Sequence, residues 1–300
     1  MIRKLILLSF LLFSSGITKS QDLLSLLDSE AKPEVERITN SFKSTRVLMS
    51  HSMEHVGGGV LDFRIMHRFG MFSDGRYEAW GFDKASMRIG LDYGLTNRLM
   101  IGIGRSTFRK EADAFVKYRL LWQTKGLKRM PVTVEYIAGM SVIGTKWDYP
   151  DRVNYFSSRL NYYHQVIIGR KFKERITLQA GPILIHRNLV DSTHDKSDLY
   201  AAEIGGRIKL TKRLALNFDY YYFRSGDLPV TATRPLSIGF DIETGGHVFQ
   251  LHFTNAPGMT ERAFVTETTG QWLKGNVEFG FNLSRVFTLD SKIKRIQKAP

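Results

Sequence analysis

The sequence contains no cysteine among its 300 residues, which excludes disulfide bonds, thiolate metal sites, cysteine nucleophiles and a lipid-modified N-terminal cysteine. Proline is also scarce, with 8 residues, whereas glycine supplies 26 residues and aromatic side chains 12% of the chain. Low-complexity tracts and clear repeats are absent from the sequence. A chain rich in glycine and aromatic residues but poor in proline is not typical of disorder, so we expect an ordered domain.

The N-terminus has the organisation of a secretory signal peptide. Arg3 and Lys4 precede an apolar run from Leu5 to Phe13, and small and polar residues follow up to Ser20. The apolar run is too short to cross a bilayer as a retained helical anchor. We therefore predict that residues 1–20 direct export and are then removed.

Long apolar stretches are missing from the rest of the chain, since none after Ser20 approaches the roughly 18 residues of a transmembrane helix. The exported chain is therefore either a soluble protein outside the cytoplasm or a membrane barrel. Its formal charge of +14 becomes +11 once Arg3, Lys4 and Lys19 are removed (14 − 3 = 11). Such a charge on an exported barrel gives no reason to expect nucleic-acid binding.

Alternating polarity, which is typical of β-strands, recurs from Val60 onward. In one segment Leu236, Ile238 and Phe240 alternate with Ser237 and Gly239. Twelve strands, an even number, are predicted at 60–69, 87–93, 99–106, 113–123, 131–143, 158–170, 176–186, 199–210, 214–223, 236–243, 247–254 and 277–289.

The predicted connections alternate in length, which is typical of outer-membrane barrels with short periplasmic turns and long external loops. Short turns are predicted at 94–98, 124–130, 171–175, 211–213 and 244–246, and longer loops, with 107–112 the shortest, fall between them. Large apolar residues occupy one face of the strands and charged residues the other, as expected where lipid bathes the outside. Aromatic residues near strand ends, such as Phe69 and Trp122, fit interfacial girdles.

The fold class that we predict is all-β, a transmembrane antiparallel up-and-down β-barrel of about twelve strands. It occupies residues 60–289 in the bacterial outer membrane, with both termini in the periplasm. Residues 21–59, which end in the glycine run 57–59, form a periplasmic N-terminal segment that either plugs the lumen or stays outside it. Residues 290–300 form a basic periplasmic tail.

Five stretches of the sequence resemble a known family. They run over Phe42–Val47, His51–Glu54, Leu61–Gly70, Leu95–Ser106 and Lys117–Leu120. Together they resemble a family of Bacteroidetes outer-membrane β-barrel proteins classed as a domain of unknown function, and the resemblance extends over nearly all of the exported chain. It implies an outer-membrane location and supplies no catalytic residue.

The inward face of the predicted barrel carries charges of both signs. Two interpretations stay open: the charges line a conducting path, because charged rings select ions, or they pair and close a narrow lumen. The predicted lining residues are Arg64, Arg68, Arg88, Asp92, Lys117, Arg119, Glu135, Glu203, Arg207, Asp219, Asp241, Glu243 and Glu278.

The short turns carry many basic residues and only Glu174 as an acidic one. A basic periplasmic rim can hold the anionic headgroups of membrane lipids or an acidic periplasmic protein, although basic turns also simply favour solubility. The predicted rim consists of Arg98, Lys125, Lys128, Arg129, Lys171, Lys173, Arg175, Lys212 and Arg213.

Histidines are the other residues that could ligate a metal or take part in catalysis. His51 and His55 have the i, i+4 spacing with which one helix face ligates a metal or haem, but the neighbouring glycines disfavour a helix, so both are weak candidates and we predict no cofactor. His67 and His164 have outward parity and would suit a phospholipase only beside a serine nucleophile. No G-x-S-x-G motif is present, and we predict no enzyme.

These features favour a channel or uptake pore for small solutes, with outer-membrane lipids as its surroundings. The alternative is a non-conducting barrel with a structural role or a periplasmic protein partner. Ligand handling by residues 51–67 and lipid hydrolysis come after these two.

Overall fold

The structure is a computed structural model that describes residues 35–190, 192–224, 226–229 and 231–289. The predicted signal peptide, the first part of the N-terminal segment and the basic tail lie outside the described residues. No helix in the described ranges is both long and apolar enough to cross a membrane.

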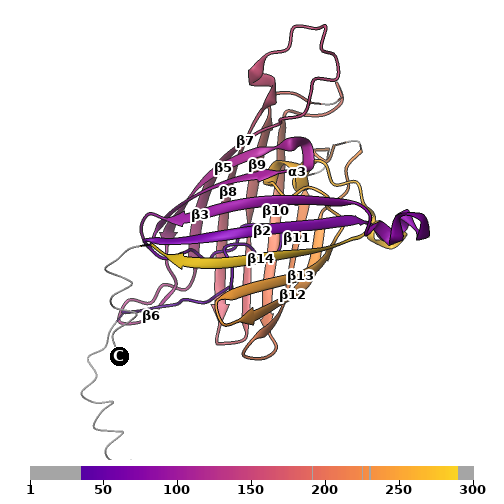
Figure 1. Ribbon diagram of the computed structural model, residues 1–300. Coiled ribbons are helices and arrows are strands. Elements are labelled where there is room, and N and C mark those ends of the chain that lie inside the picture. Colours follow the sequence, from indigo (N-terminus) through magenta and orange to yellow (C-terminus); the bar gives the residue numbers. More distant parts are fainter. Residues whose placement is uncertain (1–34, 191, 225, 230, 290–300) are drawn as a thin grey trace, which may run out of the picture.

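Twelve antiparallel strands close into a barrel (Figure 1). Each strand pairs with its neighbours along the chain, and the last strand pairs with the first to complete the closure. The barrel strands are β2 (Val60–Met71), β3 (Ala85–Gly94), β4 (Leu99–Ser106), β5 (Ala112–Leu121), β7 (Thr133–Val142), β8 (Leu160–Phe172), β9 (Ile176–Arg187), β10 (Asp198–Lys209), β11 (Leu214–Phe223), β12 (Leu236–Thr244), β13 (His247–Thr254) and β14 (Glu278–Thr288). The predicted twelve-stranded barrel is confirmed.

Smaller elements decorate the two ends of the barrel. A two-stranded sheet joins β1 (Val35–Arg37) to β6 (Thr124–Gly126), which lies inside the connection that we predicted as a plain turn. The loops between barrel strands contain α3 (Glu261–Thr266) and the 3-10 helices η1 (Phe72–Asp74), η2 (Arg76–Gly81), η3 (Phe108–Lys110), η4 (Phe156–Arg159) and η5 (Trp272–Lys274).

The two faces of the barrel differ as the sequence predicts. On β12, the outward Ile238 and Phe240 are 40% and 43% exposed, whereas the inward Ser237 and Asp241 are buried. Exposed apolar side chains of this kind cover the outer surface of most strands. Exposing so much apolar surface to water is unfavourable, so the outer face is suited to contact with lipid.

Short and long connections gather at opposite ends. The short turns after β3, β8, β10 and β12 share one end with the β1–β6 sheet, which we call the turn end. The longer connections share the other, which we call the loop end. Figure 1 shows the connection between β7 and β8, residues 143–159, projecting far beyond the strands at the loop end.

Inward glycines leave room for large side chains that lie flat against the wall. A Cβ atom at Gly139 would come within 2.2 Å of the ring of Tyr163. A Cβ atom at Gly169 would come within 2.2 Å of the Met53 sulfur. A side chain at either position would clash with these groups, so both positions require glycine. At Gly169 the group that packs against the glycine is Met53, a residue of the N-terminal segment.

Candidate functional site

The lumen is filled from the turn end by residues 41–56, which we call the plug. From β1 the chain passes into the barrel, and most plug side chains are buried, including Phe42, Val47 and Met53. It returns to the rim at the glycine run, where the Gly59 N–H donates to the carbonyl of Gly94 at 2.8 Å. Residues 41–56 of the predicted N-terminal segment therefore lie inside the barrel.

The tip of the plug is a tight reversal held by its own backbone. The N–H of Val47 donates to the Ser50 carbonyl and that of Ser52 to the Thr45 carbonyl, each at 2.9 Å. One carboxylate oxygen of Asp219 on β11 accepts the N–H groups of residues 48, 49 and 50, at 3.1, 2.8 and 3.2 Å. A buried carboxylate that accepts several backbone N–H groups is a strong, charge-assisted anchor.

Uncharged amides on the wall also bind the plug backbone. Gln250 donates to the carbonyl of residue 47 at 2.7 Å, and Asn282 donates to that of residue 48 at 2.8 Å. Gln179 donates to the His51 carbonyl at 2.7 Å and accepts the Met53 N–H at 2.9 Å. Our sequence reasoning missed these residues because it considered only charged groups, although their inward parity on predicted strands was a usable signal.

Charged wall residues bind the plug as well. Lys117 donates to the Glu54 carbonyl at 2.6 Å and also to that of Ser52. Thr45 donates to Asp92 at 2.8 Å, and Arg119 donates to the carbonyl of Met53 at 3.1 Å. The plug therefore rests on polar contacts around much of the wall, with apolar packing in between.

A second segment enters from the loop end. Helix α3 starts at the N-cap Thr260, and all six of its residues are buried. Arg262 forms a bidentate ion pair with Glu111, with both N–O distances 2.8 Å, which ties the α3 loop to the connection between β4 and β5. Glu261 forms an ion pair with Arg46 of the plug and lies 3.0 Å from Nε2 of His51. The plug and α3 thus meet inside the barrel and close it.

The predicted lining residues all belong to the wall, but they face the plug and one another rather than an open channel. Residues that contact the plug are Arg64, Arg68, Asp92, Lys117, Arg119, Glu135, Glu203, Asp219 and Glu243. Arg88 pairs with Asp113, Arg207 lies 3.9 Å from Asp241, and Glu278 is buried.

His51 and His55 do not share a helix face, because the plug is not helical there. Nε2 of His51 lies 3.0 Å from the Tyr163 hydroxyl, whereas Nε2 of His55 lies 2.6 Å from Glu135. Within the described ranges, no group of three or more His, Asp or Glu side chains is arranged to hold a metal ion. The plug therefore does not provide the shared helix face on which His51 and His55 could hold a metal or haem.

Both plug histidines are held neutral. Burial, together with the nearby Arg46 guanidinium, lowers the pKa of His51 to about 3. Burial, together with Lys117 and Arg119 and against the opposing effect of Glu135, lowers the pKa of His55 to about 4. Burial alone would raise the pKa of Glu261, but Arg46 and His51 lower it below its usual range. The docked plug thus binds fewer protons than a free one.

Acidification is expected to weaken plug docking between about pH 6.5 and pH 4. A released plug protonates its histidines near pH 6.5, whereas the docked plug does so only near pH 3 to 4. Protons therefore favour release, by up to about 2 kcal/mol for each histidine at pH 5. Glu54 opposes this, because burial raises its pKa.

Hydrogen-exchange protection factors of residues 41–56 at pH 7.5 and pH 5 measure this effect. The variant His55→Gln should lose about half of the pH dependence. Equal protection at both pH values, or an unchanged dependence in the variant, would show that the histidines do not control docking.

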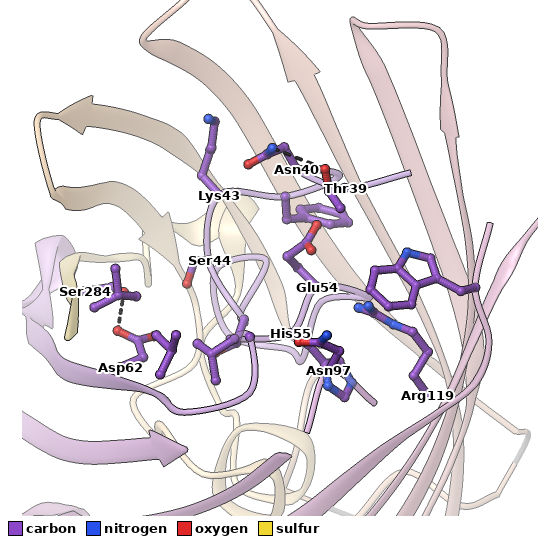
Figure 2. A pocket seen from close by; sticks show the side chains of 17 residues that line it. Thr39, Asn40, Lys43, Ser44, Glu54, His55, Asp62, Asn97, Arg119 and Ser284 are labelled. Carbon is purple, nitrogen blue, oxygen red and sulfur yellow. Dashed lines mark hydrogen bonds between the residues drawn. The ribbon is translucent and has the colours of Figure 1, made fainter. Parts of the chain in front are cut away.

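A pocket of about 440 Å³, which we call the vestibule, opens between the plug and the wall at the turn end. In Figure 2, Asp62 and Ser284 lie on one side of it and Arg119 on the other, with Glu54 of the plug between them. Trp122 also lines the vestibule and donates to the carbonyl of residue 38 at 2.7 Å. Its predicted place in the outer aromatic girdle is wrong, because a register shift after Arg119 turns it inward.

The other predicted residues lie at the barrel surface. The basic rim residues are at the turn end, and all are exposed except the half-buried Lys171, which lies 3.4 Å from Glu174. His67 stacks on Phe281 on the outer wall, with ring centroids 4.9 Å apart. His164 lies 2.8 Å from the hydroxyl of Tyr136 rather than beside a serine.

Comparisons with known proteins find one family model and several solved structures of low similarity. A family model described as "Membrane bound beta barrel domain (DUF5777)" matches residues 42–287. The NanC porin structure shares 11% identity and a TM-score of 0.46, with 76% of this chain and 98% of that one covered. The KdgM porin shares 8% identity and a TM-score of 0.44, with 76% and 99% covered. Omp33 of Acinetobacter baumannii shares 7% identity and a TM-score of 0.42, with 76% and 97% covered. No curated protein matches the chain.

Proposed function

The chain belongs to the family of membrane-bound β-barrel domains, and from this premise we propose that it is a gated outer-membrane pore for small polar solutes. The plug is the gate, and the vestibule is the aqueous mouth that ends at it. In the state described above the lumen is closed. Release of the plug, with displacement of α3, opens a path along the charged wall.

The observation that carries this proposal is the charged wall behind the plug. Arg64, Lys117, Arg119 and Asp219 are each no more than 2% exposed. Burying charges is costly, and well-packed apolar residues often stabilise a permanent interior equally well or better. A barrel that is always closed has no energetic need for this wall, whereas a barrel that opens needs a wall that water and solutes can wet.

The polar contacts of the plug support reversible docking. They are hydrogen bonds and ion pairs, which water can replace when the plug leaves. Both ends of the plug emerge at the turn end, because Asn40 and Gly57 border the same vestibule. The plug can therefore be withdrawn towards that side without the chain being threaded through the barrel.

The orientation and division of the chain follow from the same proposal. Residues 1–20 act as the export signal, and residues 21–59 form the periplasmic segment that contains the plug. The short turns and both termini face the periplasm, and the long loops face outward. The asymmetry of the connections supports this orientation, since outer-membrane barrels have short periplasmic turns.

Planar-bilayer recordings in a salt gradient test the pore directly. We expect the refolded full chain to give little or no steady current, and a variant lacking residues 41–56 to give stable current steps. Because wall charges of both signs become accessible to water, the reversal potential reports which sign dominates the opened lumen.

A second deletion separates the two obstructions. Shortening the α3 loop alone should leave the pore closed, since the plug still fills the lumen, whereas both deletions together should give larger steps than the plug deletion alone. A folded barrel that stays silent without the plug would favour the alternative, a non-conducting barrel that binds a periplasmic partner.

A further inference from the structure

A groove of about 590 Å³ lies at the turn end, between the β1–β6 sheet and the end of β5. The sheet forms one side of the groove, with Val35 opposite Gly126 and Arg37 opposite Thr124 in its register. The wall residues Leu120 and Leu121 form the other side. The groove is separate from the vestibule and from the lumen, although Trp122 contributes to both the groove and the vestibule.

Four cationic side chains line this groove, and no carboxylate does. They are Arg37, Arg98, Lys128 and Arg129, and within the described part of the chain none of them forms an ion pair. Arg37 lies over the ring of Trp122 at 5.1 Å, and Arg98 donates to a wall carbonyl at 3.4 Å. Such a cluster of one sign favours an anionic partner.

Apolar side chains lie directly beside these charges. Leu120 and Leu121 are 47% and 41% exposed, and the groove also includes Val35 and Met130. Leu120 follows the exposed Val116 and Tyr118 on the outer face of β5, so the groove opens onto the surface that we assign to lipid. A partner must therefore be anionic at one end and apolar at the other.

We propose that this groove binds one anionic phospholipid of the inner leaflet. Its phosphate lies among Arg37, Arg98, Lys128 and Arg129, and its acyl chains run along Leu120 and Leu121. A free phosphate would leave the apolar side of the groove exposed to water, whereas a lipid covers it. Juxtamembrane basic residues at an anionic leaflet are a known source of such affinity.

The groove also links the membrane to the gate. Arg37 belongs to β1, and the chain runs from there through Ile38, which is buried, into the plug. A lipid held by Arg37 and by Arg98 of the turn between β3 and β4 keeps β1 against the barrel. This link rests on the proposed gating function, whereas lipid binding itself rests only on the groove and the membrane location.

Native mass spectrometry of the full chain in detergent tests the site. Phosphatidylglycerol should be retained as a single adduct, and phosphatidylcholine should be retained about tenfold less. The variant Arg98→Gln/Lys128→Gln/Arg129→Gln should lose phosphatidylglycerol by at least about tenfold. The control Lys212→Gln/Arg213→Gln, in a basic turn away from the groove, should retain it as the unchanged chain does.

Each other result overturns the proposal. Equal loss in both variants would mean that the rim attracts anions without a defined site. Retention of phosphatidylcholine equal to that of phosphatidylglycerol would show that the basic cluster does not select an anionic headgroup. Competition by glycerophosphoglycerol as strong as that by the intact lipid would show that a free phosphate group suffices. Bilayer conductance plays no part in this readout, so failure of the gate and failure of the lipid site are distinguishable.

Discussion

Replacing Glu261 by alanine is expected to release the plug. The carboxylate of Glu261 is the counter-ion of Arg46, and both side chains are 1% exposed. Removing one partner of a buried ion pair leaves an uncompensated charge and costs about 3–5 kcal/mol. Because the charge that remains belongs to the plug, this cost falls on docking, and hydrogen-exchange protection of residues 41–56 should fall by roughly a hundredfold or more.

Two further variants make this result specific. Arg46→Met/Glu261→Met removes both charges and keeps similar volume, so it should restore much of the protection. Glu267→Ala is the matched control, since Glu267 lies in the same loop but pairs with Arg262 and Arg109, not with the plug. Equal loss of protection in Glu261→Ala and Glu267→Ala would show that the Arg46 pair has no special role.

The substitution Asp219→Asn is expected to weaken the binding of the plug tip to the barrel wall. The Asp219 carboxylate accepts three consecutive backbone N–H groups from the plug. An amide oxygen can take the place of that carboxylate oxygen but carries no negative charge, so all three hydrogen bonds lose their charge assistance. Hydrogen bonds to a charged group contribute about 1.5–3 kcal/mol each, and we expect Asp219→Asn to cost about 2–3 kcal/mol of docking free energy.

Exchange of the amide protons of residues 48–50 measures this loss directly. Asp113→Asn is the matched control, because the Asp113 carboxylate is also inside the barrel but pairs with Arg88 on β3, across the intervening strand β4. Slower or unchanged exchange at residues 48–50 in Asp219→Asn, with the barrel intact, would contradict the assigned anchor.

The barrel could be predicted from sequence because each strand carries its own two-residue pattern. The predicted limits of β4, β11 and β13 agree with the structure to the residue. Lipid outside and polar groups inside select one register for every strand. The asymmetry of the connections then fixes which ends of the strands lie together.

The closed lumen could not be predicted in the same way. The anchor between Asp219 and the plug tip joins residues about 170 positions apart, and no local pattern encodes such a contact. Helix α3 has six residues, too few for a helical period to stand out. The predicted outward position of Trp122 was wrong because the register shift after Arg119 exchanges the inward and outward positions of the residues that follow. From the sequence we could predict that charged residues line the lumen, but not which segment fills it.

A removable tether between plug and wall tests most directly whether plug position controls the pore. The chain has no cysteine, so an introduced pair is the only disulfide that can form. A Cβ atom built at Gly205 lies 3.3 Å from Cγ2 of Val47, close to the roughly 3 Å that separates a Cβ atom from the far sulfur of a disulfide. The Glu203 carboxylate, a flexible side-chain end 2.5 Å from that Cβ atom, has to turn aside.

The measurement is planar-bilayer current through Val47→Cys/Gly205→Cys placed in the Glu261→Ala background, before and after addition of reductant. We predict no current while the disulfide holds the plug, stable steps after reduction, and closure again on reoxidation, with each single-cysteine variant open throughout. Current that is the same in both redox states, or absent from both in a folded barrel, would contradict the proposal that residues 41–56 gate a pore.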